Sequence, residues 1–535
     1  ESLVNRTLAA WRGSRDQEEL ERYLRDDLNS GFSWDIPERL NMAHQVCDVW
    51  AESEPSRTAL IDVTSGARCD VSYGALRQMA DGLAHRLSAS VKTGDRVGVL
   101  RSQSIWTAAA HIAIWKLGAI SIPLFKLFAR DALEVRLTDA SARLVICDDA
   151  SAGQVQELGF ETLVPEVETL SGQRFQTRDT SSEDPAVLIY TSGTTGSPKG
   201  ALHAHRVLTG HLPGVEMSHD MLGQSGDVLW TPADWAWIGG LFDVLMPGLA
   251  LGVPVVASRS EKFSVAACKT VVQQAGVRNG FFPPTALRML KAERADIQGL
   301  RSVASGGEPL GPEMLAWGQQ AFGLSINEFY GQTECNMVVS SASSLFDAAP
   351  GCIGKPVPGH RLAVLDEFGE ESNEEGDIAV RQGSASMMLE YWNRPGATAS
   401  KYKGHWMLTG DRGIWEGEYL RFVGREDDVI TSAGYRIGPS EIEDCLLKHS
   451  SVATVGVVGK PDPLRTEIVK AYVVLKSGIT GDNALAAELQ DLVKSRLSKH
   501  SYPREIAFID SLPMTVTGKI IRKDLKRRAM AELEC

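Results

Sequence analysis

The segment Tyr190-Thr-Ser-Gly-Thr-Thr-Gly-Ser-Pro-Lys-Gly200 constrains this chain more than any other. It follows the apolar run 186–189, which is typical of a buried strand. Glycines let backbone amides turn toward a ligand, hydroxyls add donors and Lys199 adds a positive charge, so the loop suits a polyphosphate. The phosphate-binding residues that it predicts are Thr191, Ser192, Gly193, Thr194, Thr195, Gly196 and Lys199.

Two other interpretations of this loop are disfavoured. A Walker A loop has Gly before its lysine and Ser or Thr after it, whereas Pro198 precedes Lys199 here and Gly200 follows it. A Ser/Gly-rich surface linker would have no reason to follow a strand in this order and to end on a lysine.

Length and composition set wide limits on the rest of the chain. With 535 residues, we expect a large body and a smaller unit. No apolar stretch reaches the about 18 residues of a membrane span, and the net charge of −13 disfavours a nucleic-acid partner. Eight cysteines without CxxC or metal-ligand spacing predict reduced thiols. They fit a cytoplasmic location, or the mitochondrial matrix if a segment before Glu1 has been removed.

Strand and helix patterns alternate along the larger part of the chain, which predicts an α/β fold with wound, mostly parallel sheets. Residues 1 to about 50 are expected to be helical, polar and packed on the outside. Strands are expected at 96–100, 119–123, 144–147, 254–257, 280–282 and 303–305, and helices at 76–87, 108–117, 131–140, 264–275 and 285–292.

The pattern changes toward the C-terminus. From about residue 351 short, Gly-rich β-like segments such as 376–381 predominate, and near 424 a compact α+β unit begins. In that unit we expect helices at 439–448 and 483–497 and strands at 452–458 and 468–475. The predicted division is an N-terminal domain 1–424, a hinge 425–428 and a small mobile domain 429–535.

Three further motifs carry groups that suit a nucleotide. Glu328-Phe-Tyr-Gly-Gln-Thr-Glu334 places a ring, a hydroxyl and a carboxylate in one loop after a strand, although polar turns at such places are common. Ser305-Gly-Gly-Glu-Pro309 is also compatible with a plain turn. In Thr409-Gly-Asp411 the carboxylate either accepts from two ribose hydroxyls or merely shapes a turn.

Together these motifs resemble the signature of the adenylate-forming superfamily, which includes acyl-CoA synthetases, adenylation domains of peptide synthetases and luciferases. They run in family order from residue 190 to 519. The resemblance implies that Thr333 contacts the α-phosphate and the acyl carboxylate, that Glu334 binds Mg²⁺, and that Asp411 binds the ribose. The other ATP-binding residues that it implies are Gly307, Glu308, Pro309, Glu328, Phe329, Tyr330, Gly331, Gln332 and Arg425.

The resemblance extends into the C-terminal section. It implies that Asp427 is the hinge of the mobile domain, and that Lys519 of Pro513-Met-Thr-Val-Thr-Gly-Lys519 approaches the phosphate and carboxylate during adenylation. The implied CoA contacts are Ala433, Gly434, Tyr435 and Arg465, and Arg436 is an implied substrate contact.

Several residues are interpreted as structural. Ser440 and Glu443 have the spacing of a helix capping box. His203 and His205 lack a third metal ligand, and Trp235 either lines the acyl pocket or packs a core. The basic residues Arg522, Lys523, Lys526, Arg527 and Arg528 are expected to form a solvated helix face.

The chain looks most like an AMP-forming acyl-CoA synthetase of the short- to medium-chain type. Such an enzyme joins a carboxylic acid to AMP with release of pyrophosphate, turns its C-terminal domain, and transfers the acyl group to CoA. Acetyl-specific relatives carry Trp after the tyrosine of the second motif, whereas this chain has Gly331. The missing indole would leave room, so we predict an acid larger than acetate: medium-chain, branched or aromatic.

Alternatives remain at this point. A stand-alone adenylation enzyme would load the phosphopantetheine of a carrier protein; Arg436 and Arg465 favour CoA instead. Nothing in the sequence points to the oxygen chemistry of a luciferase. A non-enzymatic nucleotide-binding module is disfavoured because Lys519, Glu334 and Asp411 are all present.

Overall fold

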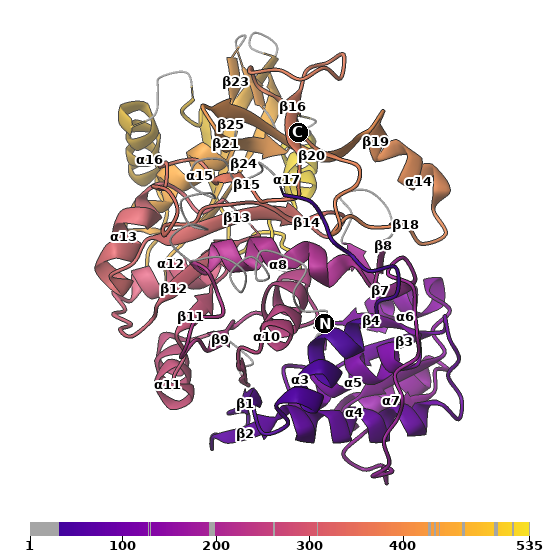
Figure 1. The fold of residues 1–535 in the computed structure, drawn as a ribbon. Coiled ribbons are helices and arrows are strands. Elements are labelled where there is room, and N and C mark those ends of the chain that lie inside the picture. The colour runs from indigo at the N-terminus through magenta and orange to yellow at the C-terminus, as the bar shows by residue number, and fades with distance from the viewer. Residues whose placement is uncertain are drawn as a thin grey trace. The chain divides into compact units, whose positions relative to one another are not determined.

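The computed structural model describes residues 32–126, 128, 130–191, 198–259, 263–307, 309–425, 428, 430–432, 435–437, 439–462, 466–496, 501–515 and 518–533. The chain divides into two compact units (Figure 1). Unit 1 comprises Glu1–Gly193, Ser197–Leu362 and Val380–Met407, and unit 2 comprises Thr194–Gly196, Ala363–Ala379 and Leu408–Cys535.

The first sheet of unit 1 has seven strands in the order β18-β8-β7-β4-β3-β5-β6. Its strands from β7 to β6 are parallel, while β8 and β18 add an antiparallel edge. Strands β4 and β5 are buried along their whole length, as expected for parallel strands in the middle of a sheet. The strands are β3 (Arg96–Leu100), β4 (Ile120–Leu124), β5 (Leu144–Cys147), β6 (Thr162–Leu163), β7 (Pro185–Thr191), β8 (Lys199–Ala204) and β18 (Glu390–Tyr391).

The second sheet has nine strands in the order β15-β14-β13-β12-β11-β9-β10-β1-β2. It is parallel from β13 to β1, with antiparallel strands at both edges. Its strands are β1 (Thr58–Asp62), β2 (Cys69–Ser72), β9 (Leu229–Trp230), β10 (Val255–Ala257), β11 (Asn279–Phe281), β12 (Ser302–Gly306), β13 (Ile326–Gln332), β14 (Asn336–Ser340) and β15 (Lys355–Pro356). The predicted wound, mostly parallel α/β architecture is confirmed.

Helices connect these strands, and several begin at a serine. The side chains of Ser72 and Ser104 cap the helices α4 and α5 by accepting from the amides of Ala75 and Thr107. Helices α4 and α5 lie side by side (Figure 1). The helices of unit 1 are η1 (His44–Asp48), α3 (Val49–Ser53), α4 (Tyr73–Leu87), α5 (Ile105–Lys116), α6 (Arg130–Asp139), α7 (Asp149–Glu157), α8 (Val207–Ser218), α9 (Ile238–Gly240), η2 (Leu241–Leu245), α10 (Met246–Leu251), α11 (Val265–Ala275), α12 (Pro284–Ala292), α13 (Glu313–Phe322) and α14 (Pro395–Ser400).

The prediction that residues up to about 50 are polar and lie outside is wrong for the segment around η1; residues 1–31 lie outside the described residues. Met42, Val46 and Cys47 are buried to 2% exposure or less. The fully buried Lys116 fixes η1 with an ion pair of 2.7 Å to Asp48. Burial alone would raise the pKa of Asp48, but His44 and Lys116 lower it to about 2. The sequence analysis missed this short buried helix because most of the segment before it is polar.

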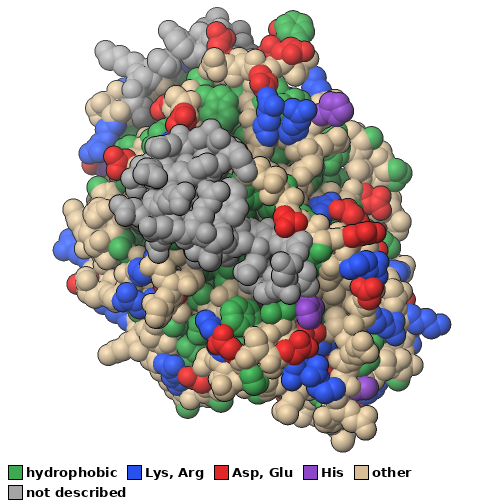
Figure 2. Space-filling model, in the orientation of Figure 1, with side chains coloured by type: hydrophobic (Ala, Val, Ile, Leu, Met, Phe, Trp, Pro, Cys, Tyr) green, Lys and Arg blue, Asp and Glu red, His purple; other side chains and the backbone are tan. Residues whose placement is uncertain are grey.

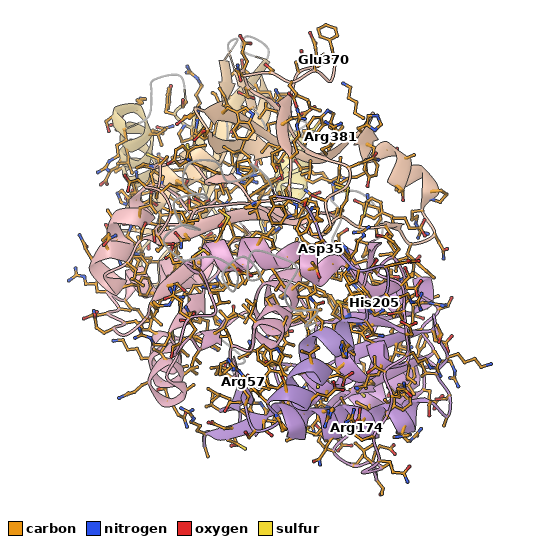
Figure 3. The ribbon with its side chains drawn as sticks, in the orientation of Figure 1. Asp35, Arg57, Arg174, His205, Glu370 and Arg381 are labelled. Atoms are coloured by element: carbon orange, nitrogen blue, oxygen red, sulfur yellow. The ribbon has the colours of Figure 1, made fainter. Side chains whose placement is uncertain are left out.

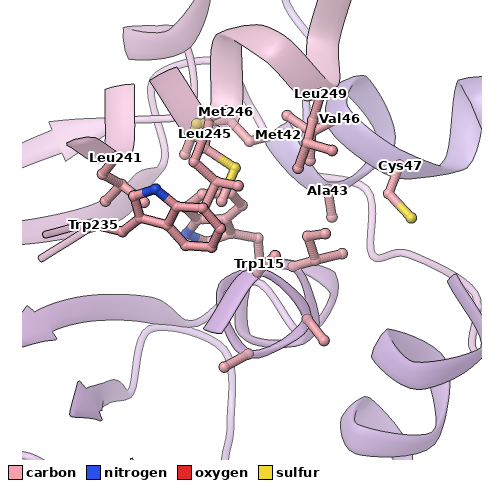
Figure 4. Packing of buried hydrophobic residues seen from close by; sticks show 14 of the residues in the cluster. Met42, Ala43, Val46, Cys47, Trp115, Trp235, Leu241, Leu245, Met246 and Leu249 are labelled. Atoms are coloured by element: carbon pink, nitrogen blue, oxygen red, sulfur yellow. The ribbon is translucent and has the colours of Figure 1, made fainter. Parts of the chain in front are cut away.

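The main core of unit 1 lies where η1, α5, η2 and α10 meet (Figure 4). It contains Trp115 and Trp235, both fully buried, beside Leu241 and Met246. The indole of Trp115 donates to the carbonyl oxygen of Ala186 at 2.9 Å, which ties this core to strand β7. The strand that leads into the predicted phosphate loop is therefore tied to the main core of the unit.

Unit 2 carries most of one sheet and all of another. The first has the order β16-β17-β20-β19, with β21 paired to β20, and the second has the order β23-β22-β25-β24, with β26 paired to β25. The strands are β16 (Leu362–Leu365), β17 (Gly376–Arg381), β19 (Tyr402–Lys403), β20 (Trp406–Glu416), β21 (Tyr419–Arg425), β22 (Ile430–Ser432), β23 (Tyr435–Ile437), β24 (Val452–Asp462), β25 (Thr466–Leu475) and β26 (Glu505–Phe508). Its helices are α15 (Pro439–Leu447), α16 (Asn483–Arg496) and α17 (Arg522–Ala531). Among the described residues, no helix combines the length and the apolar character needed to cross a membrane.

Candidate active site

The predicted phosphate loop connects two antiparallel strands. Thr191 at the end of β7 is the register partner of Lys199 at the start of β8. Residues Ser192–Ser197 lie outside the described residues, so the phosphate contacts of Ser192, Gly193, Thr194, Thr195 and Gly196 remain predictions. The buried strand predicted before the loop is confirmed.

Tyr391 links the cation of this loop to the acidic end of the second motif. The Lys199 ammonium lies 4.8 Å from the centre of the Tyr391 ring. The Tyr391 hydroxyl donates to Oε1 of Glu334 at 2.7 Å. Burial and the neighbouring Glu334 carboxylate raise the pKa of Tyr391, so the phenol stays a donor. One aromatic ring thus holds the phosphate-loop lysine and the predicted Mg²⁺ ligand at its face and its edge.

Backbone hydrogen bonds fix this tyrosine against both motifs. Strand β18 pairs with β8, with Tyr391 opposite Ala201. One residue further, the Trp392 amide donates to the Gly200 carbonyl at 2.7 Å, and the Met388 amide donates to the Glu334 carbonyl at 2.8 Å. The sequence analysis missed Tyr391, although the aromatic pair at 391–392 ahead of a turn was available as a signal.

The two motifs expected on the adenine side are neighbours. In the parallel pair β12–β13, Ser305 lies opposite Glu328 and Gly306 opposite Phe329. The Glu328 carboxylate accepts from the Leu310 amide at 3.1 Å, which closes the loop after β12 onto β13. Burial raises the pKa of Glu328 to about 7, against smaller opposing effects of that amide and of a nearby arginine. Glu328 is therefore placed to shape this loop.

The other described residues of these motifs lie in the loop after β12 and at the end of β13. Gly307 has a φ of +99°, which favours glycine, and the Pro309 carbonyl accepts from Arg288 at 3.1 Å. Tyr330, Gly331, Gln332 and Thr333 are half-buried. Glu308 lies outside the described residues.

The sequence analysis expected the missing indole at Gly331 to leave room for a larger acid, and the structure gives this glycine another role. A Cβ at this position would lie 1.7 Å from the carbonyl oxygen of Asn336, so the glycine lets the β13–β14 turn close on itself. Asn336 itself has a φ of +65°, and its side chain donates to the Ser386 carbonyl at 2.7 Å. Gly331 therefore allows a tight turn, and the absent side chain does not by itself open a cavity.

Three other residues behave as structural groups. His205, which is labelled in Figure 3, is fully buried and accepts from the Met42 amide at 3.0 Å, and burial lowers its pKa to about 3. Burial likewise lowers the pKa of His203 to about 3, with a smaller opposing effect of the Thr333 backbone. Trp235 lies wholly within the core, which agrees with the packing alternative (Figure 4).

In unit 2 the structure brings two predicted nucleotide residues together. Asp411 on β20 is the register partner of Arg425 on β21. The Asp411 amide donates to the Thr409 hydroxyl at 3.1 Å, and that hydroxyl donates to the Ile378 carbonyl at 2.7 Å. The Thr-Gly-Asp segment is thus a fixed part of the sheet.

Lys519 lies in a tight hairpin before α17. The Lys519 amide donates to the Thr515 hydroxyl at 3.1 Å, and the Thr515 amide donates to the Lys519 carbonyl at 2.7 Å. Gly518 has a φ of +79°. Strand β23 contains Tyr435 and Arg436. Asp427, Ala433, Gly434 and Arg465 lie outside the described residues, so their hinge and CoA roles remain predictions.

Comparisons with known proteins match this arrangement. Residues 47–392 match the model of the family "AMP-binding enzyme", and residues 441–519 match the model of its C-terminal domain. The chain belongs to the AMP-binding enzyme family. Its reaction class is that of an AMP-forming acyl-CoA ligase, and family membership does not identify its acid.

Individual members of the family resemble the chain over nearly its whole length. An acetyl-coenzyme A synthetase of Bacillus subtilis (strain 168) is 33% identical over 91% of this chain and 90% of that protein. A 4-hydroxybutyrate–CoA ligase of Metallosphaera sedula is 32% identical over 90% and 89%. The crystal structure of a Brucella canis acyl-CoA synthetase has a TM-score of 0.70 at 32% identity and covers 98% of both chains.

The donors of this AMP-binding enzyme fit a magnesium ion at Glu334. The residue is 8% exposed, and among the described residues no lysine, arginine or histidine forms an ion pair with it. A nearly buried carboxylate without a protein cation suits a divalent cation. No group of three or more His, Cys, Asp or Glu is gathered for a metal in the described part of the chain. Mg²⁺ would then be held by Glu334 together with phosphate oxygens and water, as this ion prefers.

The charge for a polyphosphate has to come from within the site. Basic and acidic side chains are interspersed on the face shown in Figure 2. The net charge of the chain is −13, so its overall field does not favour an anion. Lys199 is therefore the described cation of the predicted phosphate loop in unit 1, and its contact with ATP stays a prediction.

Proposed function

We propose that this enzyme activates a carboxylic acid larger than acetate with Mg·ATP and transfers the acyl group to CoA. The observation that carries the proposal is the arrangement of Lys199, Tyr391 and Glu334, because it sets a phosphate-loop cation and a metal-binding carboxylate on one ring. Family membership supplies the reaction class, and the residue roles rest on the motifs.

In the first half-reaction the acid's carboxylate attacks the α-phosphate of ATP and pyrophosphate leaves. Lys199 and its loop hold the leaving phosphates, while Thr333 orients the carboxylate and the α-phosphate. The Lys519 ammonium stabilises the charge that gathers in the transition state. Glu334 would hold a Mg²⁺ ion, which would neutralise further charge on the phosphates.

In the second half-reaction the CoA thiol attacks the acyl carbon and AMP leaves. This step needs an open path to the acyl group and no ammonium at the phosphates, so the C-terminal domain turns about Asp427 and withdraws Lys519. Gly434 and its neighbours then face CoA. One site thus serves both steps.

The proposed size of the acid rests on the resemblance alone, in which acetyl-specific relatives carry a tryptophan where this chain has Gly331, and not on a cavity beside this glycine. Gly331 lies where even a Cβ collides with the Asn336 carbonyl, so a tryptophan cannot occupy this position without a shift of the turn. The relatives named above include an acetyl-coenzyme A synthetase and a 4-hydroxybutyrate–CoA ligase, so family membership leaves the acid open. A pocket separates acids that differ by one methylene by only about 1 to 3 kcal/mol, and we expect overlapping substrates.

The test is release of pyrophosphate and AMP with acids from C2 to C10, including branched and aromatic ones, with and without CoA. We expect one group of larger acids to release pyrophosphate and CoA to drive multiple turnovers to a thioester. Pyrophosphate release that CoA leaves unchanged would favour a carrier protein as acceptor. Acetate with the highest kcat/KM would contradict the proposed size, and no release with any acid would contradict the proposed activity.

A further inference from the structure

Helix α17 follows directly on the loop of Lys519, and its first residue is Arg522. The Ile521 amide donates to the Pro513 carbonyl at 2.8 Å, so the loop closes immediately before the helix. Arg522 is three residues from Lys519 in the sequence. Any displacement of this arginine is therefore carried into the loop of the lysine.

Arg522 forms a forked contact with Glu443 of helix α15. Its Nη2 lies 2.8 Å from each carboxylate oxygen, and its Nε lies 3.2 Å from Oε1. Oε1 also accepts from the Val457 amide of β24 at 3.0 Å. Only 16% of the Arg522 side chain and 11% of the Glu443 side chain are exposed. The contact thus joins α17, α15 and β24 and is largely shielded from solvent.

These contacts correct one interpretation. Arg522 is not part of a solvated face, whereas Arg527 on the same helix has 69% of its side chain exposed. The Glu443 carboxylate contacts Arg522 and Val457. The side chain of Ser440 lies outside the described residues, so the capping box stays a prediction.

The same helix reaches Asp428, the last residue of the predicted hinge 425–428 and the neighbour of Asp427. Nη1 of Arg522 lies 3.5 Å from Oδ2 of Asp428, and Nζ of Lys526 lies 3.5 Å from Oδ1. Asp428 has 5% of its side chain exposed. Arg522 and Lys526 are four residues apart and so lie on one face of the helix. Both oxygens of a buried carboxylate beside the hinge are thereby held by the helix that follows Lys519.

We propose that Arg522 is a positioning residue for adenylation, which acts by coupling the Lys519 loop to the hinge through Glu443 and Asp428. The inference rests on the proposed role of Lys519. A turn at Asp427 can place the ammonium accurately only if the segment after the hinge and the lysine loop move as one body. Arginine suits this task because its planar fork fixes direction as well as distance, which a lysine does not.

The test separates the two half-reactions in the full-length enzyme. Adenylation is measured as single-turnover pyrophosphate release without CoA, using the acid that releases it fastest in the panel. Thioester formation is measured with CoA and the synthetic adenylate of that acid. We expect Arg522→Met to slow adenylation about 10- to 100-fold, the effect of a misplacement near 1 Å, and to leave thioester formation within about twofold. Arg522→Lys should fall between the two.

Arg527→Met is the matched control, because it removes an exposed arginine of the same helix that pairs with Asp524. We expect it to leave both half-reactions unchanged. Thermal unfolding of each variant shows whether Arg522→Met remains folded, and Glu443→Gln offers a milder break of the same contact. Equal losses in the two half-reactions for both Arg522→Met and Glu443→Gln would overturn the inference.

A double-mutant comparison identifies the residue through which Arg522 acts. In a Lys519→Ala background, Arg522→Met should slow adenylation by no more than about twofold further, because the lysine that it positions is already gone. A full additional loss in that background would overturn the inference and leave the role of Lys519 intact. A Lys519→Ala variant with the wild-type adenylation rate would overturn both.

Discussion

Hydrogen bonds and buried neutral groups hold Glu334 in unit 1, whereas in unit 2 ion pairs hold Arg522, which follows the hairpin of Lys519. Around Glu334 the partner is the neutral hydroxyl of Tyr391, and the fully buried His203 interacts with the backbone of the preceding residue, Thr333. Around Lys519 the supports are Arg522 with its carboxylates. The two arrangements differ in what disturbs them. Unit 1 should be sensitive to protonation and to added volume, and unit 2 to salt.

Acid should act on unit 1 first, and this is the largest effect that we expect. Burial lowers the pKa of its histidines at 111, 203, 205, 219 and 360 to about 3. Their unfolded forms take up protons near pH 6.5, so the stability that they contribute is lost as the pH falls below 6.5. Each can cost up to about 1.4 kcal/mol per pH unit.

Three buried carboxyls of unit 1 oppose this loss. Burial raises the pKa values of Asp234, Asp243 and Glu328, so the folded state binds their protons more tightly down to about pH 4. Five histidines outweigh three carboxyls. In unit 2 the pKa values of Glu505 and Glu532 are lowered, so their contribution is lost only below about pH 4.5.

Tryptophan fluorescence measures this difference, because every tryptophan except Trp415 belongs to unit 1. We expect the urea midpoint of the fluorescence transition to fall from pH 6.5 downward. A midpoint that stays constant to pH 4.5 would contradict the comparison.

Glu334→Gln removes the carboxylate but keeps the acceptor for Tyr391. We expect adenylation to fall about 10²- to 10³-fold, the loss typical of one transition-state stabilising group. Synthetic acyl-adenylate should still give thioester, because pyrophosphate is lost when the adenylate forms and the second half-reaction does not involve it. Equal losses in both half-reactions would show that Glu334 serves the fold and not the phosphates.

Tyr391→Phe removes only the hydroxyl that holds Glu334. We expect the Mg²⁺ concentration for half-maximal pyrophosphate release to rise about 10- to 100-fold, as for other groups that orient a metal ligand. The rate at saturating Mg²⁺ should change less. Trp392→Phe on the next residue is the control, because its indole donates to the Asp139 carbonyl instead. An unchanged Mg²⁺ dependence in Tyr391→Phe would show that the Tyr391 hydroxyl does not orient Glu334 for the metal ion.

Gly331→Ala tests the close backbone contact in unit 1. The added Cβ would meet the Asn336 carbonyl, so the turn has to shift at a cost of about 1 to 3 kcal/mol. Gly153→Ala in helix α7 is the matched control, since nothing lies within 4 Å of a Cβ there, and it should stabilise slightly. Urea unfolding compares them, and equal stabilities would contradict the packing argument.

Salt should produce the smallest effect, and in unit 2 only. Glu505 and Glu532 are bridged by Lys460 and Lys470, with about a third of each carboxylate side chain exposed. Raising the salt concentration to 1 M should weaken this network by about 1 kcal/mol or less. Hydrogen exchange of α17 amides should then accelerate, whereas amides of α8 should not. Faster hydrogen exchange in α8 alone would contradict the expectation that salt weakens unit 2 and not unit 1.

The strands and helices of the core could be predicted because the spacing of apolar residues along the chain shows which side of each element is buried. Strand 144–147 and helix 439–448 coincide with β5 and α15 within one residue. The motifs at 305 and 328 were predicted separately, and the parallel register of β12 and β13 makes them neighbours.

What the sequence did not predict depends on contacts between distant segments. Tyr391 matters because β18 returns to pair with β8, and Glu443 binds an arginine far along the chain. The role of Gly331 was also hidden, because only the folded turn shows what a side chain would meet. Local pattern carries none of this information.

The most direct test of the account is a mass-spectrometric measurement of the enzyme with Mg·ATP and each acid, before and after addition of CoA. We expect an enzyme-bound acyl-adenylate, up to one per chain, for acids larger than acetate, and its conversion to the acyl-CoA thioester when CoA is added. Acetyl-adenylate that forms faster than every other adenylate, or no adenylate with any acid, would contradict it.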